Sequence, residues 1–165
     1  AVGSPYVVIP IAGVDEFGTE DKLQRFANFL NKTGEAFKKE GLALLYHNHA
    51  DELRTKINRT PVLPLLLQRT NPDYVNFELD TYWAEVGGYS PIVLLAEYPC
   101  RFPILHIKDG TLDEDKTRFR ELGQGDMDFN DLLKRTFTDK TIKWLIYEQD
   151  DDFRSSSLES TLQSL

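Results

Sequence analysis

Cysteine is almost absent from this chain, and the one cysteine, Cys100, has no partner for an internal disulfide. A chain without disulfides is typical of a reducing compartment, so we expect a cytoplasmic protein. Long hydrophobic runs are absent too, since no apolar stretch approaches the roughly 18 residues that a membrane-spanning helix needs. The sequence therefore predicts no membrane association.

Positive charge is in deficit, with 19 Lys and Arg residues against 27 Asp and Glu residues and a formal net charge of −8. Binding to nucleic-acid phosphates requires clustered Lys and Arg side chains. The longest basic cluster is the pair Lys38-Lys39, which we interpret as part of a solvated helix face. The charge balance thus argues against a nucleic-acid partner.

The apolar residues, 41% of the chain, gather in short runs that alternate with helical patterns. Continuous apolar runs rich in β-branched residues suit strands buried on both faces, as in parallel sheets. Strands are predicted near residues 6–12, 42–48, 74–79, 102–107 and 142–147. Helices are predicted near residues 19–40, 62–67, 90–98, 128–137 and 156–165. This alternation predicts an α/β fold with a parallel sheet, formed by residues 1–165 as a single domain.

Polar, titratable residues follow four of these apolar runs. His47 and His49 end the second run, Asp80 ends the third, His106 lies at the end of the fourth, and Glu148 follows the fifth. All three histidines of the chain lie at such ends. Because the C-terminal ends of parallel strands line the active site in α/β proteins, we expect one shared polar site.

A divalent cation is the ligand that this set of side chains suits best. Asp80, His106 and Glu148 offer two carboxylates and an imidazole, which fit Mn²⁺, Mg²⁺, Co²⁺ or Zn²⁺, and His47 or His49 could supply a fourth ligand. Structural alternatives stay open for every member. Asp80 could cap a helix or turn, His106 could be a buried hydrogen-bonded histidine, Glu148 could pair with Lys108, and the His47/His49 pair could serve packing.

Two further features carry weaker predictions. Tyr82 and Trp83 could form an apolar wall for a sugar ring, although a place in the core is as good an explanation. The segment Gly123-Gln124-Gly125 could let backbone amides approach an anionic substrate. It lacks the spacing of a nucleotide-binding loop, so a plain flexible turn is the favoured interpretation.

These motifs together resemble the sugar phosphate isomerase/epimerase family, the xylose-isomerase-like TIM barrels that include inosose dehydratases and ketose epimerases. The resemblance rests on 46–49 (YHNH), 78–83 (ELDTYW), 105–109 (LHIKD), 123–126 (GQGD) and 147–150 (YEQD). It implies a TIM-barrel-type fold of which this chain holds only the last five of eight βα units. A five-strand sheet cannot close into a barrel, so we also expect a homo-oligomer.

The resemblance also implies a site and an activity. The family's metal ligands fall on Asp80, His106 and Glu148, and His47 stands where the family commonly has a glutamate. Trp83 stands where ketose epimerases often have a histidine, and this difference argues against a standard ketose 3-epimerase. The roles that we assign are catalytic for Glu148, His47 and Lys108, and substrate-binding for His49, Trp83 and Tyr82.

The function that follows is a metal-dependent isomerase or epimerase that abstracts a proton next to the carbonyl of a sugar or sugar phosphate. The alternatives are a keto-sugar dehydratase of the inosose type and a non-catalytic barrel fragment. An endonuclease IV-like DNA repair enzyme shares the barrel, but it would need more metal ligands and a basic face.

Overall fold

The computed structural model describes residues 3–113 and 118–150. Its centre is one sheet of five strands in the order β1-β2-β5-β6-β9, and all four neighbouring pairs are parallel. The strands are β1 (Tyr6–Ile9), β2 (Ala43–His47), β5 (Val75–Asp80), β6 (Ile104–Ile107) and β9 (Trp144–Tyr147). The predicted parallel α/β fold is therefore confirmed. β1 and β2 end three residues and one residue before their predicted limits, and β5 ends one residue beyond its limit. β6 and β9 begin two residues later than predicted and end where predicted.

The described residues form seven helices. They are α1 (Val14–Phe17), α2 (Glu20–Lys39), α3 (Asp51–Arg54), α4 (Val62–Arg69), α5 (Thr81–Val86), α6 (Pro91–Glu97) and α7 (Asn130–Thr138). Of these, α2, α4, α6 and α7 lie where helices were predicted, and α1, α3 and α5 were not predicted. Two short antiparallel pairs complete the fold: β3 (Lys56–Ile57) with β4 (Thr60–Pro61), and β7 (Asp109–Gly110) with β8 (Phe119–Arg120). The helix predicted at 156–165 lies outside the described residues.

Local sequence explains where these helices begin. The Thr19 side chain accepts a hydrogen bond from the backbone N–H of Lys22, which is the N-cap contact expected of a threonine before α2. Pro91 occupies the first turn of α6, where its missing N–H costs no hydrogen bond. The Asp128 side chain accepts a hydrogen bond from the backbone N–H of Asn130, the first residue of α7. Asp128 lies one residue before the N-cap residue, Phe129.

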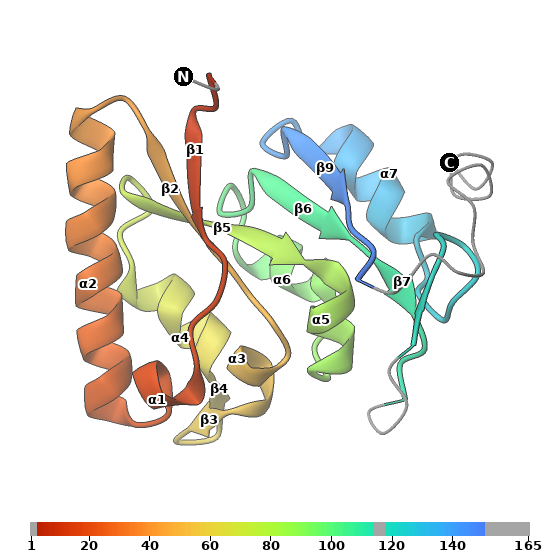
Figure 1. Ribbon diagram of the computed structural model, residues 1–165, viewed down its shortest axis with the longest axis horizontal. Coiled ribbons are helices and arrows are strands. Elements are labelled where there is room, and N and C mark those ends of the chain that lie inside the picture. Colours follow the sequence, from red (N-terminus) through yellow and green to blue (C-terminus); the bar gives the residue numbers. More distant parts are fainter. Residues whose placement is uncertain (1–2, 114–117, 151–165) are drawn as a thin grey trace.

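The helices cover one face of the sheet. Leu44 and Phe77, on this face of β2 and β5, share a core cluster with Leu30 of α2 and Leu66 of α4. Side chains alternate across a strand, so their neighbours in sequence point to the opposite, concave face of the half-barrel. Within the described residues, β1 and β9 form the two edges of the sheet, with α2 on the β1 side and α7 near β9 (Figure 1).

The concave face is apolar at one end and polar at the other. Residues from β1, β6 and β9, including Trp144 and Ile146, line a hollow of about 380 Å³ that opens on this face. Trp144 is 60% exposed, although it lies in a strand. At the C-terminal ends of the strands the same face carries the predicted site residues. No helix in the described part of the chain is long and apolar enough to cross a membrane.

Candidate active site at the strand ends

The register of the sheet brings the predicted residues together. His47 at the end of β2 pairs with Glu78 of β5, and Asp80 at the end of β5 pairs with His106 of β6. The ligand atoms of His47, Asp80 and His106 lie within 4.8 Å of one another. Glu148, one residue beyond β9, reaches His106 with its Oε2 atom 3.1 Å from Nδ1. These four side chains therefore converge on one rim of the sheet.

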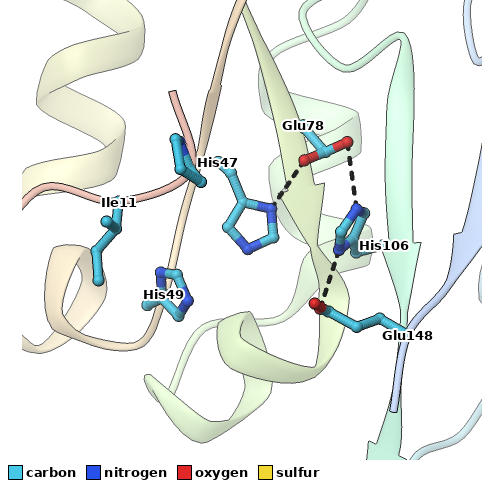
Figure 2. Close-up of a pocket in the computed structure, with 7 residues that line it drawn as sticks. Ile11, His47, His49, Glu78, His106 and Glu148 are labelled. Atoms are coloured by element: carbon cyan, nitrogen blue, oxygen red, sulfur yellow. Dashed lines mark hydrogen bonds and ion pairs between the residues drawn. The ribbon is translucent and has the colours of Figure 1, made fainter. Parts of the chain in front are cut away.

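Glu78 joins this group, although it was not among the predicted site residues. Its Oε2 lies 3.0 Å from His47 Nδ1, and its Oε1 lies 3.2 Å from His106 Nε2 (Figure 2). Burial opposes ionisation of this carboxyl, but the hydrogen bonds from His106 and His47 outweigh it and lower the pKa to about 2. Strand alternation could have pointed to Glu78, since it lies two residues before Asp80 on the same face.

Asp80 uses its two oxygens differently. Oδ1 accepts a hydrogen bond of 2.9 Å from the backbone N–H of Trp83 and so caps α5. Oδ2 is buried, has no hydrogen-bond partner within the described structure, and lies 3.8 Å from His47 Nε2. Burial raises the pKa of Asp80, opposed by the charge of Lys108. A buried carboxylate oxygen without a donor is the kind of atom that a bound cation would satisfy.

Lys108 places a buried ammonium group beside these carboxylates. Its Nζ lies 2.8 Å from Glu148 Oε2, 2.6 Å from Asp150 Oδ2 and 3.6 Å from Asp80 Oδ2. Burial would lower the pKa of Lys108, but the charge of Asp80 and the hydrogen bonds to Asp150 and Glu148 raise it. The ion pair between Glu148 and Lys108, considered as an alternative explanation for Glu148, is thus present together with the contact to His106.

The donor set fits a divalent ion. His47 and His106 supply imidazole nitrogen and Asp80 supplies carboxylate oxygen, with Glu148 next to His106. Nitrogen and oxygen donors of this kind bind Zn²⁺, Mn²⁺ or Co²⁺ readily. The orphaned Oδ2 of Asp80 points into this group and supports the same assignment.

The three predicted substrate-binding residues differ in position. His49 lines a cavity of about 300 Å³ together with His47, Glu78, His106 and Glu148. Trp83 packs beside His49, with ring centroids 5.9 Å apart. Tyr82 is fully buried and donates a hydrogen bond to the backbone oxygen of Thr111. The structure therefore brings His49 and Trp83 to the site and places Tyr82 in a core cluster behind it.

The glycine segment 123–125 does not offer its amides to a ligand. The backbone N–H groups of Gly123 and Gly125 donate to Oδ2 of Asp109, and those of Gly110 and Met127 donate to Oδ1. Asp109 is fully buried. A Cβ atom at Gly125 would collide with this carboxylate, which explains a glycine there. The segment is a turn held by hydrogen bonds to the carboxylate of Asp109, the first residue of β7.

Comparison with known proteins places the whole arrangement in context. Residues 1–163 match the family model described as xylose isomerase-like TIM barrel. An inosose dehydratase from Clostridium tetani is 27% identical over an alignment of 162 positions, and this alignment covers 88% of this chain and 53% of the relative. A crystal structure of a sugar phosphate isomerase/epimerase from Parabacteroides distasonis superposes with a TM-score of 0.80 at 31% identity.

The match covers 99% of this chain and 56% of the protein chain in that crystal structure. The chain therefore spans about half the length of the relatives that it matches. An L-ribulose 3-epimerase structure, 19% identical with a TM-score of 0.62, shares the fold.

Proposed function

Because the chain belongs to the xylose isomerase-like TIM barrel family, we propose that it forms the metal-binding and proton-transferring part of a sugar isomerase or epimerase. The observation that carries the proposal is the convergence of His47, Asp80 and His106 within 4.8 Å at the strand ends. The adjoining cavity of about 300 Å³ suits a ligand the size of a small sugar or sugar phosphate.

We assign the ion to His47, Asp80, His106 and Glu148. A divalent ion held there would polarise the substrate carbonyl and make the neighbouring carbon–hydrogen bond more acidic. Two imidazoles among the ligands favour Zn²⁺, Co²⁺ or Mn²⁺ over Mg²⁺. His47 serves the ion rather than proton transfer, because its Nδ1 is already engaged by Glu78.

Glu148 is the base that we assign to the proton transfer. Burial would raise its pKa, but hydrogen bonds from Lys108 and His106 lower it, so the carboxylate is ionised at neutral pH. Lys108 fixes the position of this carboxylate through the contact of 2.8 Å. The pKa of His49 is lowered by burial and by the neighbouring His47, so a neutral imidazole borders the cavity from another side, with the ring of Trp83 packed beside it.

A keto-sugar dehydratase is the second candidate. Its support is the match to inosose dehydratases, among them the one from Clostridium tetani. Dehydration begins with the same proton abstraction next to a carbonyl and continues with loss of a β-hydroxyl group. NMR analysis of products from a panel of ketoses and inososes distinguishes the two, because only the dehydratase releases water from the carbon skeleton.

The test of the proposed site is His106→Ala. We expect the wild-type chain to retain a divalent ion after loading and dialysis, as measured by elemental analysis, and the variant to lose it. The matched control is Glu85→Gln, which alters a carboxylate of α5 outside the cavity and should retain the ion. Far-UV circular dichroism should be the same for all three proteins.

Two results would speak against the proposal. A wild-type chain that retains no divalent ion would overturn the assigned ligand set. A chain that retains the ion but converts no sugar of the panel would favour the non-catalytic alternative instead.

A further inference from the structure

The Glu78 carboxylate lies between the two imidazoles of the site. Each of its oxygens faces a different ring: Oε2 faces Nδ1 of His47 at 3.0 Å, and Oε1 faces Nε2 of His106 at 3.2 Å (Figure 2). Glu78 is 5% exposed, and its strand neighbours hold it from both sides in the centre of the sheet. One buried carboxylate therefore contacts both histidines of the proposed ligand set.

This contact determines which ring nitrogens carry hydrogen. An ionised carboxylate only accepts hydrogen bonds, so the nitrogen that faces it must be the protonated one. Glu78 therefore keeps hydrogen on Nδ1 of His47 and on Nε2 of His106. An imidazole that binds a cation uses the lone pair of its other nitrogen, which here is Nε2 of His47 and Nδ1 of His106. In the ion-free chain Nδ1 of His106 instead donates to the ionised carboxylate of Glu148 at 3.1 Å, and a bound ion would replace that hydrogen.

The two nitrogens that do not face Glu78 point toward the remaining carboxylates. His47 Nε2 lies 3.8 Å from Oδ2 of Asp80, and His106 Nδ1 lies 3.1 Å from Oε2 of Glu148. The atoms able to bind a cation thus face the same space as Asp80 and Glu148, while Glu78 stays behind the rings. With an ion bound between these groups, the two histidines would have opposite tautomers.

We propose that Glu78 is a positioning residue that selects opposite tautomers of His47 and His106 and so aims both lone pairs at one metal ion. The inference rests on the proposed function, because it presumes that the histidines bind metal. A carboxylate behind a ligating imidazole fixes the orientation of the ring and increases its basicity. No contact of Glu78 with the ion or the substrate is required.

The tautomers can be observed directly in the wild-type chain. Zn²⁺ is diamagnetic, so long-range ¹H–¹⁵N spectra of the Zn²⁺-loaded, histidine-labelled protein report which ring nitrogen carries hydrogen. We expect hydrogen on Nδ1 for His47 and on Nε2 for His106, with signals assigned in the His49→Gln variant. The same tautomer at both positions, or hydrogen on the other nitrogen of either ring, would overturn the proposal.

Replacement of Glu78 by Gln tests the energetic consequence. The Gln amide has nearly the same shape, but its NH₂ group donates, so one histidine loses its acceptor and must reverse its tautomer. We expect Zn²⁺ affinity, measured by competition with a chelator, to fall roughly 10–100-fold, as is typical for loss of a partner behind a metal ligand. Glu78→Asp keeps an acceptor-only carboxylate, so it should lose less affinity than Glu78→Gln.

Glu52→Gln is the matched control, since it alters another buried carboxyl, which accepts hydrogen bonds from the Tyr46 hydroxyl and the His49 backbone. Its Zn²⁺ affinity should equal that of the wild type. Wild-type affinity in Glu78→Gln would overturn the inference and leave the proposed function standing. Absence of Zn²⁺ binding in the wild type would overturn both. If Glu78→Gln does not fold, the wild-type spectrum still decides.

Discussion

Glu52 gives the fold a pH dependence that can be measured. Its side chain is fully buried, and it accepts hydrogen bonds from the Tyr46 hydroxyl and from the backbone N–H of His49 at 2.9 Å. Burial raises the pKa of Glu52 from 4.5 to about 7, more than these hydrogen bonds lower it. Between about pH 4.5 and about pH 7, the folded chain therefore holds a proton on Glu52 that the unfolded chain has released.

The direction of the effect follows from this order of pKa values. A carboxyl whose folded pKa is raised contributes full stability below the unfolded pKa, and the contribution is lost as pH rises through the folded pKa. A difference of about 2.5 pKa units, at about 1.4 kcal/mol per unit, corresponds to roughly 3 kcal/mol. The free energy of unfolding should therefore lose roughly 3 kcal/mol from this residue between about pH 4 and about pH 8.

The variant Glu52→Gln isolates this contribution, because Gln resembles the protonated acid in shape and has no charge to gain. At acid pH the variant should be about as stable as the wild type, and above neutral pH it should be more stable by roughly 3 kcal/mol. Urea unfolding followed by circular dichroism at several pH values measures the difference. The control Glu35→Gln, which alters a half-exposed carboxylate of α2 paired with Lys39, should show no trend of this size. A difference between wild type and Glu52→Gln that stays constant with pH would refute the reasoning.

Two further predictions concern the loop after β6 and the concave face. Gly125→Ala should destabilise the chain by roughly 1–3 kcal/mol in thermal or urea unfolding, because its Cβ would collide with the Asp109 carboxylate. Gly13→Ala is the control, since its Cβ would meet only the movable end of the Glu16 side chain closely, and equal stability of both variants would contradict the prediction. The exposed Trp144 and the hollow beside it should make the chain associate with itself as concentration rises, as measured by sedimentation velocity, and Trp144→Ser should weaken the association. A wild-type monomer at every concentration would contradict this expectation.

The parallel sheet was predictable because its signals are local. Each strand is a short apolar run, and buried parallel strands need apolar side chains on both faces. The cap at Thr19 and the proline at Pro91 marked helix starts for equally local reasons. The positions of His47, Asp80, His106 and Glu148 on one rim then followed from the rule that parallel strand ends meet at one edge of the sheet.

The parts that were missed depend on partners distant in sequence. Glu78 belongs to the site because β2 and β6 flank β5 and place an imidazole on each side of it. Tyr82 and Trp83 are adjacent in α5, yet only the helix orientation puts Tyr82 in the core and Trp83 beside His49. The turn at 123–125 is explained by Asp109, which lies more than a dozen residues earlier and accepts its amides.

Structural and functional explanations of a residue, treated as alternatives in the sequence, prove compatible in the molecule. Asp80 caps α5 with Oδ1, as the structural explanation expects, and leaves Oδ2 without a hydrogen-bond donor in the described residues beside His47. A carboxylate can serve both purposes because its two oxygens point in different directions. Asparagine at this position would keep one oxygen for the cap but place an amide nitrogen where Oδ2 lies, so the cap and the proposed ion-binding role of Asp80 are chemically separable. An alanine would remove both at once, and its effect on metal binding could not be told apart from the loss of the helix cap.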